Sequence, residues 1–389
     1  MRDVDHTSET DYDLHGLVGV RLLMASPGDV AAVSRQLGPI RKPLARDPDI
    51  LIRFVDRMRM SSRVRLVGLD DAGFTDDAFL VLLGRNGGHA RVKIALEQVG
   101  DRCEITCETG VSRVPLLIPI INLTALSKGA LPLHASAFAY DGGGVLVTGW
   151  AKGGKTETLL AFMSKGATYI GDEWVYISGD GGLMWGIPQP VRVWDWHLRY
   201  LPEYRSLVGK SDRMRLRAVK ASLALARNVR RWGHRWQATA AGLDRVVPAL
   251  SRQLYVDMPP ERLFNAAEVR LSSRVDCLFF VASHELPDVT VRPIDPQQVA
   301  RRMAFSLQYE RLDFMSYYLK YRFAFPERRN ELIERAGQLE RELLIQALAG
   351  KEAYEVYHPY PVPIPAMFDA ISPLINRSIR AATSLHATA

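Results

Sequence analysis

One stretch of the sequence has the residue types and spacing of a phosphate-binding loop. It reads Gly149-Trp150-Ala151-Lys152-Gly153-Gly154-Lys155-Thr156 and fits the pattern GxxxxGK[ST] in full. A β-branched run precedes it and a helical pattern follows, so backbone N–H groups and the helix amino terminus would point into one concavity. Lys155 would neutralise phosphate charge there, and Thr156 would offer a hydroxyl to Mg²⁺. The stretch predicts a cradle for the β and γ phosphates of a nucleotide, the alternative being a merely glycine-rich turn.

Two acidic residues and one histidine flank this loop at informative distances. Asp172 lies 17 residues after Lys155, at the end of the next expected strand. In a parallel α/β arrangement that strand returns to the loop edge of the sheet, where a carboxylate can take the proton of an attacking hydroxyl or hold a metal. Glu173 is either a metal partner or a solvated charge. His134, 21 residues before Lys155, begins an expected strand and is either an active-site partner or an ordinary core or surface histidine.

These residues need a sheet and helices to position them. Six short runs of strand-forming residues predict an amino-terminal β-rich region. They are separated by turn residues (Gly, Asp and Pro) such as those in Ser26-Pro27-Gly28-Asp29. The runs are Val18 to Met24, Leu51 to Val55, Val64 to Leu69, Ala78 to Leu83, Val92 to Leu96 and Cys103 to Cys107. From Val114 the pattern predicts a helix, a strand from His134 to Tyr140, a second strand into the loop, and then a helix. The last third reads as helical, with helices over Pro296 to Tyr321 and Glu327 to Leu348.

Composition and charge restrict the class of protein. The chain has 389 residues, 47% of them hydrophobic and 24% charged, which is typical of globular α/β proteins with more than one domain. The longest apolar run, Val114 to Leu126, contains two prolines and is too short to span a membrane. The acidic first residues do not resemble a secretory signal, so we expect a cytoplasmic protein. Three cysteines are too few for a disulfide framework or a four-cysteine zinc site.

The net charge of +7 is concentrated in one segment. Between Arg213 and Gln237 there are eight basic residues and no acid: Arg213, Arg215, Arg217, Lys220, Arg227, Arg230, Arg231 and Arg235. Helical spacing places several of them on one stripe, which is either a solvated helix face or a docking surface for an acidic partner. Trp232 and Trp236 would stack on bases or anchor the helix, but no nucleic-acid fold signature accompanies them. Arg192 and Arg199 either stabilise a transferring phosphoryl group or are surface arginines.

Taken together, these residues resemble the catalytic core of HPr kinase/phosphorylase and related P-loop serine kinases. The resemblance is carried by Leu133-His134-Ala135-Ser136, Leu146-Val147-Thr148-Gly149, Gly154-Lys155-Thr156-Glu157-Thr158, Lys165-Gly166-Ala167 and Ile170-Gly171-Asp172-Glu173. It implies a phosphoenolpyruvate-carboxykinase-like fold, with Asp172 as general base and His134 as an active-site partner near the phosphates. It also implies that Lys155 binds phosphate and Thr156 binds magnesium. The second acid is Glu173 where aspartate is common, and the Gly-rich signature beyond the acidic pair is not visible, so HPr itself is not the expected substrate.

The sequence therefore predicts an ATP- and Mg²⁺-dependent kinase that moves a phosphoryl group to a serine-like hydroxyl on a protein, peptide or small molecule. The nucleotide site would comprise Gly149 to Thr156 together with Glu157, with Thr156 and Glu173 at the metal. We expect a disordered tail over 1–16, a β-rich accessory domain over 17–112, a kinase-like domain over 113–378 with a basic helical insertion at 205–245, and a tail over 379–389. A homo-oligomer is compatible with this pattern. The alternatives are a nucleotide-dependent regulatory protein and a nucleic-acid-stimulated ATPase.

Overall fold

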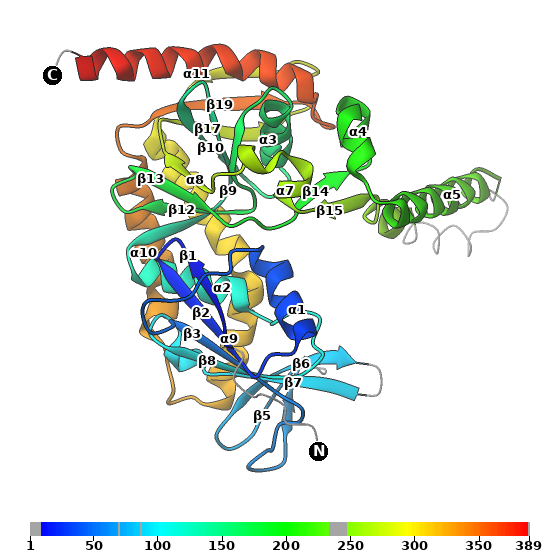
Figure 1. Cartoon of the computed structure of the whole chain (residues 1–389), viewed down its shortest axis with the longest axis vertical. Coiled ribbons are helices and arrows are strands. Elements are labelled where there is room, and N and C mark those ends of the chain that lie inside the picture. Colours follow the sequence, from blue (N-terminus) through cyan, green and yellow to red (C-terminus); the bar gives the residue numbers. More distant parts are fainter. Residues whose placement is uncertain (1–8, 69–70, 86–87, 233–246, 388–389) are drawn as a thin grey trace.

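The computed structural model describes residues 9–68, 71–85, 88–232 and 247–387. These residues form a mixed α/β protein with one large sheet in the amino-terminal third and another in the remainder (Figure 1). The α/β class predicted from the sequence is therefore confirmed. No helix in the described part of the chain is long and apolar enough to cross a membrane.

The amino-terminal sheet has eight strands among the described residues, in the order β1-β2-β3-β8-β7-β6-β5-β4. Their bounds are β1 Thr10–Leu14, β2 Val18–Leu23, β3 Ile50–Val55, β4 Arg65–Val67, β5 Ala72–Phe74, β6 Phe79–Arg85, β7 Gly88–Ile94 and β8 Cys103–Glu108. The central strands β2, β3 and β8 run parallel, and the other neighbours pair antiparallel. The predicted disordered tail over 1–16 is wrong from Thr10, because Thr10–Leu14 pairs with β2.

Helix α1, Pro27–Leu37, was not predicted, since the sequence of Ser26 to Asp29 is typical of a turn. In the structure these residues begin the helix. The Ser26 hydroxyl accepts from the Asp29 backbone N–H, the Asp29 carboxylate accepts from the Ser26 N–H, and Pro27 occupies the first turn. The helix is needed because β2 and β3 are parallel neighbours, and a parallel pair requires a crossover.

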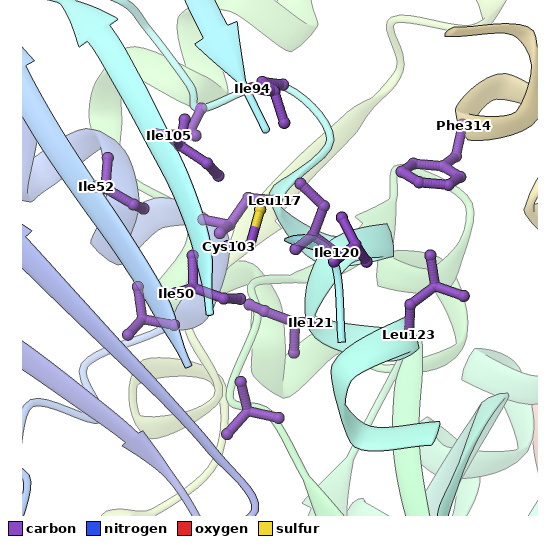
Figure 2. Packing of buried hydrophobic residues seen from close by; sticks show 14 of the residues in the cluster. Ile50, Ile52, Ile94, Cys103, Ile105, Leu117, Ile120, Ile121, Leu123 and Phe314 are labelled. Atoms are coloured by element: carbon purple, nitrogen blue, oxygen red, sulfur yellow. The ribbon is translucent and has the colours of Figure 1, made fainter. Parts of the chain in front are cut away.

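The core of the amino-terminal sheet also includes elements from much later in the chain. Ile50, Ile52, Cys103 and Ile105 of the strands pack with Leu117, Ile120 and Ile121 of α2 (Leu117–Ser127) and with Phe314 of α9 (Leu312–Ala324) (Figure 2). Helix α10, Glu331–Leu348, joins the same cluster through Ile333 and Ala336. The amide of Asn330 donates to the carbonyls of Leu96 and Val99. The carboxyl-terminal helices thus attach the first sheet to the rest of the molecule.

The second sheet has nine strands among the described residues, in the order β16-β13-β12-β9-β10-β17-β19-β18, with β11 also paired to β9. Their bounds are β9 Ala130–Tyr140, β10 Gly143–Gly149, β11 Thr168–Gly171, β12 Trp174–Ser178, β13 Leu183–Gly186, β16 Ser272–Arg274, β17 Cys277–Ser283, β18 Thr290–Pro293 and β19 Glu352–His358. β10, β17 and β19 run parallel in its centre. His134 lies in the middle of β9 rather than at its start, which corrects the predicted strand boundary.

Helices cover both faces of this second sheet. Along β10, Val145 and Val147 face the cluster that contains α3 (Lys155–Met163) and α11 (Ile364–Ala387), whereas Leu146 faces the cluster that contains α8 (Pro296–Glu310) and α10. Burial on both faces explains why these strands read as continuous apolar runs. The phosphate-loop motif lies between β10 and α3, at the carboxyl end of a central strand.

The remaining elements lie around this sheet. They are α4 His197–Tyr200, α5 Lys210–Trp232, α7 Pro260–Leu263, the ribbon of β14 Val191–Trp194 and β15 Tyr255–Met258, and the short 3-10 turns Pro202–Leu207 and Ala266–Glu268. A further 3-10 turn, Leu96–Gln98, lies between β7 and β8 of the first sheet. The basic helix predicted within 205–245 is confirmed over Lys210–Trp232, and residues 233–246 lie outside the described residues.

Two predictions in the carboxyl-terminal third are wrong. The single helix predicted over Pro296 to Tyr321 is two helices, α8 and α9, separated at Arg311. The tail predicted over 379–389 is helical up to Ala387, because α11 continues through it.

Candidate active site

The backbone of the GxxxxGKT loop requires its glycines. Gly149 has φ 157° and Gly154 has φ 101°. A Cβ on Gly149 would lie 2.3 Å from the carbonyl oxygen of Val281, and one on Gly154 would lie 2.4 Å from Nε2 of His358. At Gly153 a Cβ would lie 2.9 Å from a loop carbonyl. The loop therefore presents bare backbone between β10 and α3, as a phosphate cradle needs.

Lys155 is held across the loop that precedes it. It is the first residue of α3, and its side chain is buried with the residue 6% exposed. Nζ donates to the carbonyl oxygens of Trp150 at 3.0 Å and Gly149 at 3.4 Å. Burial lowers the pKa of Lys155, and the neighbouring carboxylates of Glu173 and Asp172 oppose this shift. The ammonium group thus lies over the same loop whose backbone forms the cradle.

Asp172 follows β11 and lies beside the loop, where the sequence placed it. β10 and β11 both pair antiparallel with β9, so they run in the same direction and end at one edge of the sheet. The Asp172 carboxylate accepts from the Ser136 hydroxyl at 2.5 Å and from Thr156 Oγ1 at 3.1 and 3.2 Å. Burial, followed by the nearby charge of Glu173, raises the pKa of Asp172 to about 7. A buried carboxylate between two hydroxyls is a candidate acid or base.

His134 lies between two carboxylates. Its Nε2 is 3.2 Å from Glu173 Oε2, and its Nδ1 is 2.6 Å from Glu310 Oε1. Burial alone would lower the pKa of His134, but the two carboxylates outweigh burial and raise it. Hydrogen bonding to His134 lowers the pKa of Glu173. The arrangement favours an imidazolium next to the loop, with Lys155 near enough to oppose it.

The backbone turns at Glu173, between β11 and β12. Its φ is 71°, in the left-handed region that non-glycine residues rarely adopt. Such a conformation persists only where the surrounding structure fixes it, and it often occurs at functional sites. The turn directs Glu173 to His134, while Asp172 faces Thr156. The two adjacent carboxylates therefore contact different residues, Glu173 the strand histidine and Asp172 the loop threonine.

Three residues that the sequence analysis did not single out support this site. Glu310 is the last residue of α8, 176 positions from its partner His134, so no local pattern points to it. His197 is fully buried, receives the Trp194 N–H at its Nδ1, and places Nε2 3.0 Å from the carboxylate of Glu157. His358, also fully buried, has Nε2 2.8 Å from the Gly153 carbonyl oxygen. These contacts fix the loop and the first turn of α3.

A cleft of about 780 Å³ opens beside the acidic pair and lies between the two sheets. Glu173 and Trp174 line it from the second sheet, Arg192 from β14 and Glu310 from α8. Arg113 lines it from the segment after β8. Arg192 is paired with Asp257 at 3.0 Å. The structure thus brings Arg192 into the wall of the cleft, whereas Arg199 lines a separate hollow beside α4 and α5.

An exposed aromatic pair stands at the loop. The rings of Trp150 and Tyr309 are 4.9 Å apart, and about half of each residue is exposed (48% and 49%). Tyr309 is adjacent to Glu310, so the pair lies on the side of the loop that carries the His134 contacts.

In the described ranges, no group of three or more His, Cys, Asp or Glu side chains has the arrangement of a metal centre. The three cysteines are free and buried, and Cys103 and Cys107 lie on the same face of β8. Neither a family model nor a curated protein matches this chain at a significant level. The function must therefore be argued from the site itself.

Proposed function

We propose that the chain is an ATP- and Mg²⁺-dependent phosphotransferase that moves the γ-phosphoryl group to a hydroxyl acceptor, with a P-loop kinase fold of the HPr kinase type. The observation that carries the proposal is the position of Asp172. Its carboxylate lies within hydrogen-bonding distance of the Thr156 hydroxyl of the phosphate loop and of a second hydroxyl, on Ser136. A carboxylate at this place can take a proton or hold Mg²⁺, and the second hydroxyl contact, from Ser136, supports the role of base.

The loop residues Gly149 to Thr156 would hold the nucleotide phosphates. Backbone N–H groups and the amino terminus of α3 face the phosphate oxygens, and Lys155 adds a full positive charge. Glu157, bound to His197, fixes the first turn of α3 and thereby the position of Thr156. Pre-positioned donors of this kind account for most of the catalysis in phosphoryl transfer.

The donor set fits a magnesium ion. Thr156 Oγ1 and the Asp172 carboxylate lie 3.1 Å apart at the end of the loop, so two hard oxygen ligands meet there, whereas Glu173, the predicted metal ligand, is turned to His134. Thr156 and one oxygen of the Asp172 carboxylate would hold the ion, and the other carboxylate oxygen would remain for the proton of the acceptor. When bound, Mg²⁺ would neutralise charge on the β and γ phosphates.

The transfer step uses Asp172 as the base. The acceptor oxygen forms a bond to the γ-phosphorus while the bond from that phosphorus to the β–γ bridging oxygen breaks, so that ADP leaves. The acceptor hydroxyl gives its proton to Asp172. Lys155 and His134 stabilise the charge on the phosphoryl oxygens as it moves. The acceptor reaches this point from the cleft that ends at Glu173 and Trp174.

The test is incubation of the purified protein with γ-labelled ATP and Mg²⁺ in an extract of its own cells. Lys155→Ala and Asp172→Asn should each reduce label transfer by about 10²- to 10⁴-fold. Asp180→Asn is the matched control, because Asp180 lies in the exposed turn between β12 and β13 and bonds only to that turn. Equal thermal stability of Asp172→Asn and Asp180→Asn would show that the loss is chemical.

Two results would contradict the proposal. If Asp172→Asn transfers label as well as the wild type, the carboxylate is not the base. If the wild type binds ATP but releases only phosphate, a nucleotide-dependent regulatory protein or a stimulated ATPase accounts for the loop better.

A further inference from the structure

A basic hollow lies outside the candidate active site, where α4 and the Pro202–Leu207 turn meet the first half of α5. It has a volume of about 320 Å³, and its lining residues are Asp195, Leu198, Arg199, Arg205, Val208, Arg213, Leu216, Arg217 and Lys220. Its aliphatic members Leu198, Val208 and Leu216 are almost fully buried and form the floor. Helix α5 extends from this point away from the body of the molecule (Figure 1).

The rim of the hollow carries more positive charge than its neighbours neutralise. Five of the nine lining residues are cationic and one is acidic. Lys220 Nζ is 2.6 Å from the carboxylate of Asp195, so the one acidic residue of the lining is paired with Lys220. Arg199, Arg213 and Arg217 form no ion pair within the part of the chain that the structure describes. Uncompensated guanidinium groups around one concavity repel each other, and an anionic ligand would relieve that repulsion.

The spacing along α5 produces this rim. Arg213, Arg217 and Lys220 are four and three residues apart and so share one helix face, while Leu216 between them turns to the floor. Arg215, on another face, donates instead to the carbonyl oxygens of Gln253 and Tyr255. The basic stripe of the sequence thus divides into arginines that fasten the helix and arginines that face the hollow. Arg227, Arg230, Arg231 and Arg235 lie outside the residues whose side chains are described.

The hollow is connected to the phosphate loop. His197, the first residue of α4, is bound to Glu157 in the first turn of α3 at 3.0 Å. Arg199 of the rim lies two residues after His197, and Asp195 lies two residues before it. A ligand in the hollow is therefore held by the same short segment that fixes the loop.

We propose that the hollow docks an acidic peptide segment of the protein that receives the phosphoryl group. This inference rests on the proposed function and names its substrate class. Carboxylates of the segment would meet Arg199, Arg213 and Arg217 as charge-assisted hydrogen bonds, and one aliphatic side chain would cover the floor. A nucleic acid fits less well, because binding of single strands depends on aromatic stacking platforms and no residue that lines the hollow is aromatic.

The test measures peptide binding to the full-length protein by fluorescence anisotropy. The probe is a short fluorescein-labelled peptide of glutamates around a central leucine, at physiological salt. Arg213→Gln combined with Arg217→Gln should weaken binding by on the order of tenfold. The matched control is Arg301→Gln combined with Arg341→Gln, which removes the same charge from exposed positions on α8 and α10 and should leave binding unchanged. Serine in place of the central leucine of the peptide should also weaken binding.

Three outcomes would overturn the proposal: no binding of the probe to the wild type, equal weakening by the control pair, or displacement of the peptide by a single-stranded oligonucleotide of equal charge at lower concentration. The last would favour nucleic acid as the partner. Lys155→Ala separates this inference from the proposed function, since it should abolish phosphoryl transfer and keep peptide binding. If the wild type binds the peptide but transfers no phosphoryl group, only the proposed enzymatic function is contradicted. If it transfers the phosphoryl group but does not bind the peptide, only the proposed docking site is contradicted.

Discussion

Gly154→Ala is the substitution for which the structure gives the most definite stability prediction. Gly154 has φ 101°, and an added Cβ would lie 2.4 Å from Nε2 and 2.9 Å from Cε1 of His358. The imidazole cannot move away at low cost, because it is fully buried and its Nε2 is 2.8 Å from the Gly153 carbonyl oxygen. The substitution therefore adds a steric clash to backbone strain.

The two costs can be separated with a matched control. Gly166 also has a left-handed φ, 84°, but no atom lies within 4 Å of the position of its Cβ. Gly166→Ala should lower the free energy of unfolding by about 1–2 kcal/mol, the cost of left-handed backbone for an L residue. Gly154→Ala adds an overpacking cost of about 1–3 kcal/mol. Its total should therefore be about 2–5 kcal/mol.

Urea unfolding of both variants, in the wild-type and His358→Ala backgrounds, measures these terms. In the His358→Ala background, Gly154→Ala should lower the free energy of unfolding no more than Gly166→Ala does, because the clashing ring is absent. The hydrogen bond lost with His358 is missing from every protein in that background, so it cancels in the double-mutant cycle. Under the proposed function, Mg-ATP at a hundredfold excess over Kd should stabilise both the wild type and Gly166→Ala by about 2.7 kcal/mol. Equal costs for Gly154→Ala and Gly166→Ala in the wild-type background would refute the assigned clash between the loop and His358.

Three further predictions concern the fold and the site. Asp11→Asn should lower the free energy of unfolding by about 1.5–3 kcal/mol at pH 7, since Asp11 accepts two hydrogen bonds from Arg21. Because Arg21 lowers the pKa of Asp11, this stabilisation is present above the unfolded-state pKa near 4 and is lost as the pH falls further. The unfolding curves of the wild type and the variant should therefore converge in acid. Tyr176→Phe should cost about 1–3 kcal/mol in thermal unfolding, because Asn122 Oδ1 then loses a buried donor at 2.8 Å. Under the proposed function, Glu310→Gln should reduce the rate of label transfer more than it changes the KM for ATP, because it removes one of the two carboxylates that raise the pKa of His134. An unchanged rate would contradict that role.

The sequence predicted the centre of the second sheet well because its signals there are local. The GxxxxGKT motif spans one strand–turn–helix unit, and the structure forms that unit from β10 and α3. The position of Asp172 followed from the rule that successive parallel strands end at one edge, and this rule holds here although β9 lies between the two strands. Residues such as these depend on one supersecondary unit, which a pattern of spacing can describe.

The residues that the sequence did not predict depend on contacts between distant segments. Glu310 reaches His134 only because α8 packs against the face of the sheet opposite to α3. His197 and His358 each appear in the sequence as single histidines, with no partner at a recognisable spacing. Asp29 was misassigned for a different reason: the residues of a helix capping box are also common turn residues, so the pattern of Ser26 to Asp29 fits both.

The amino-terminal sheet lines part of the cleft beside Glu173, although the sequence suggested only an accessory domain. It is joined to the second sheet by His15, whose Nε2 is 2.7 Å from the Gly186 carbonyl oxygen, and by the amide of Gln189, which donates to the Gln36 backbone at 2.8 Å. Gln36 and Gln189 both line the cleft that also contains Glu173. Residues of both sheets line that cleft, so a molecule that approaches Glu173 through it would lie between them. Under the proposed function, the first sheet thus selects the acceptor while the second binds the nucleotide.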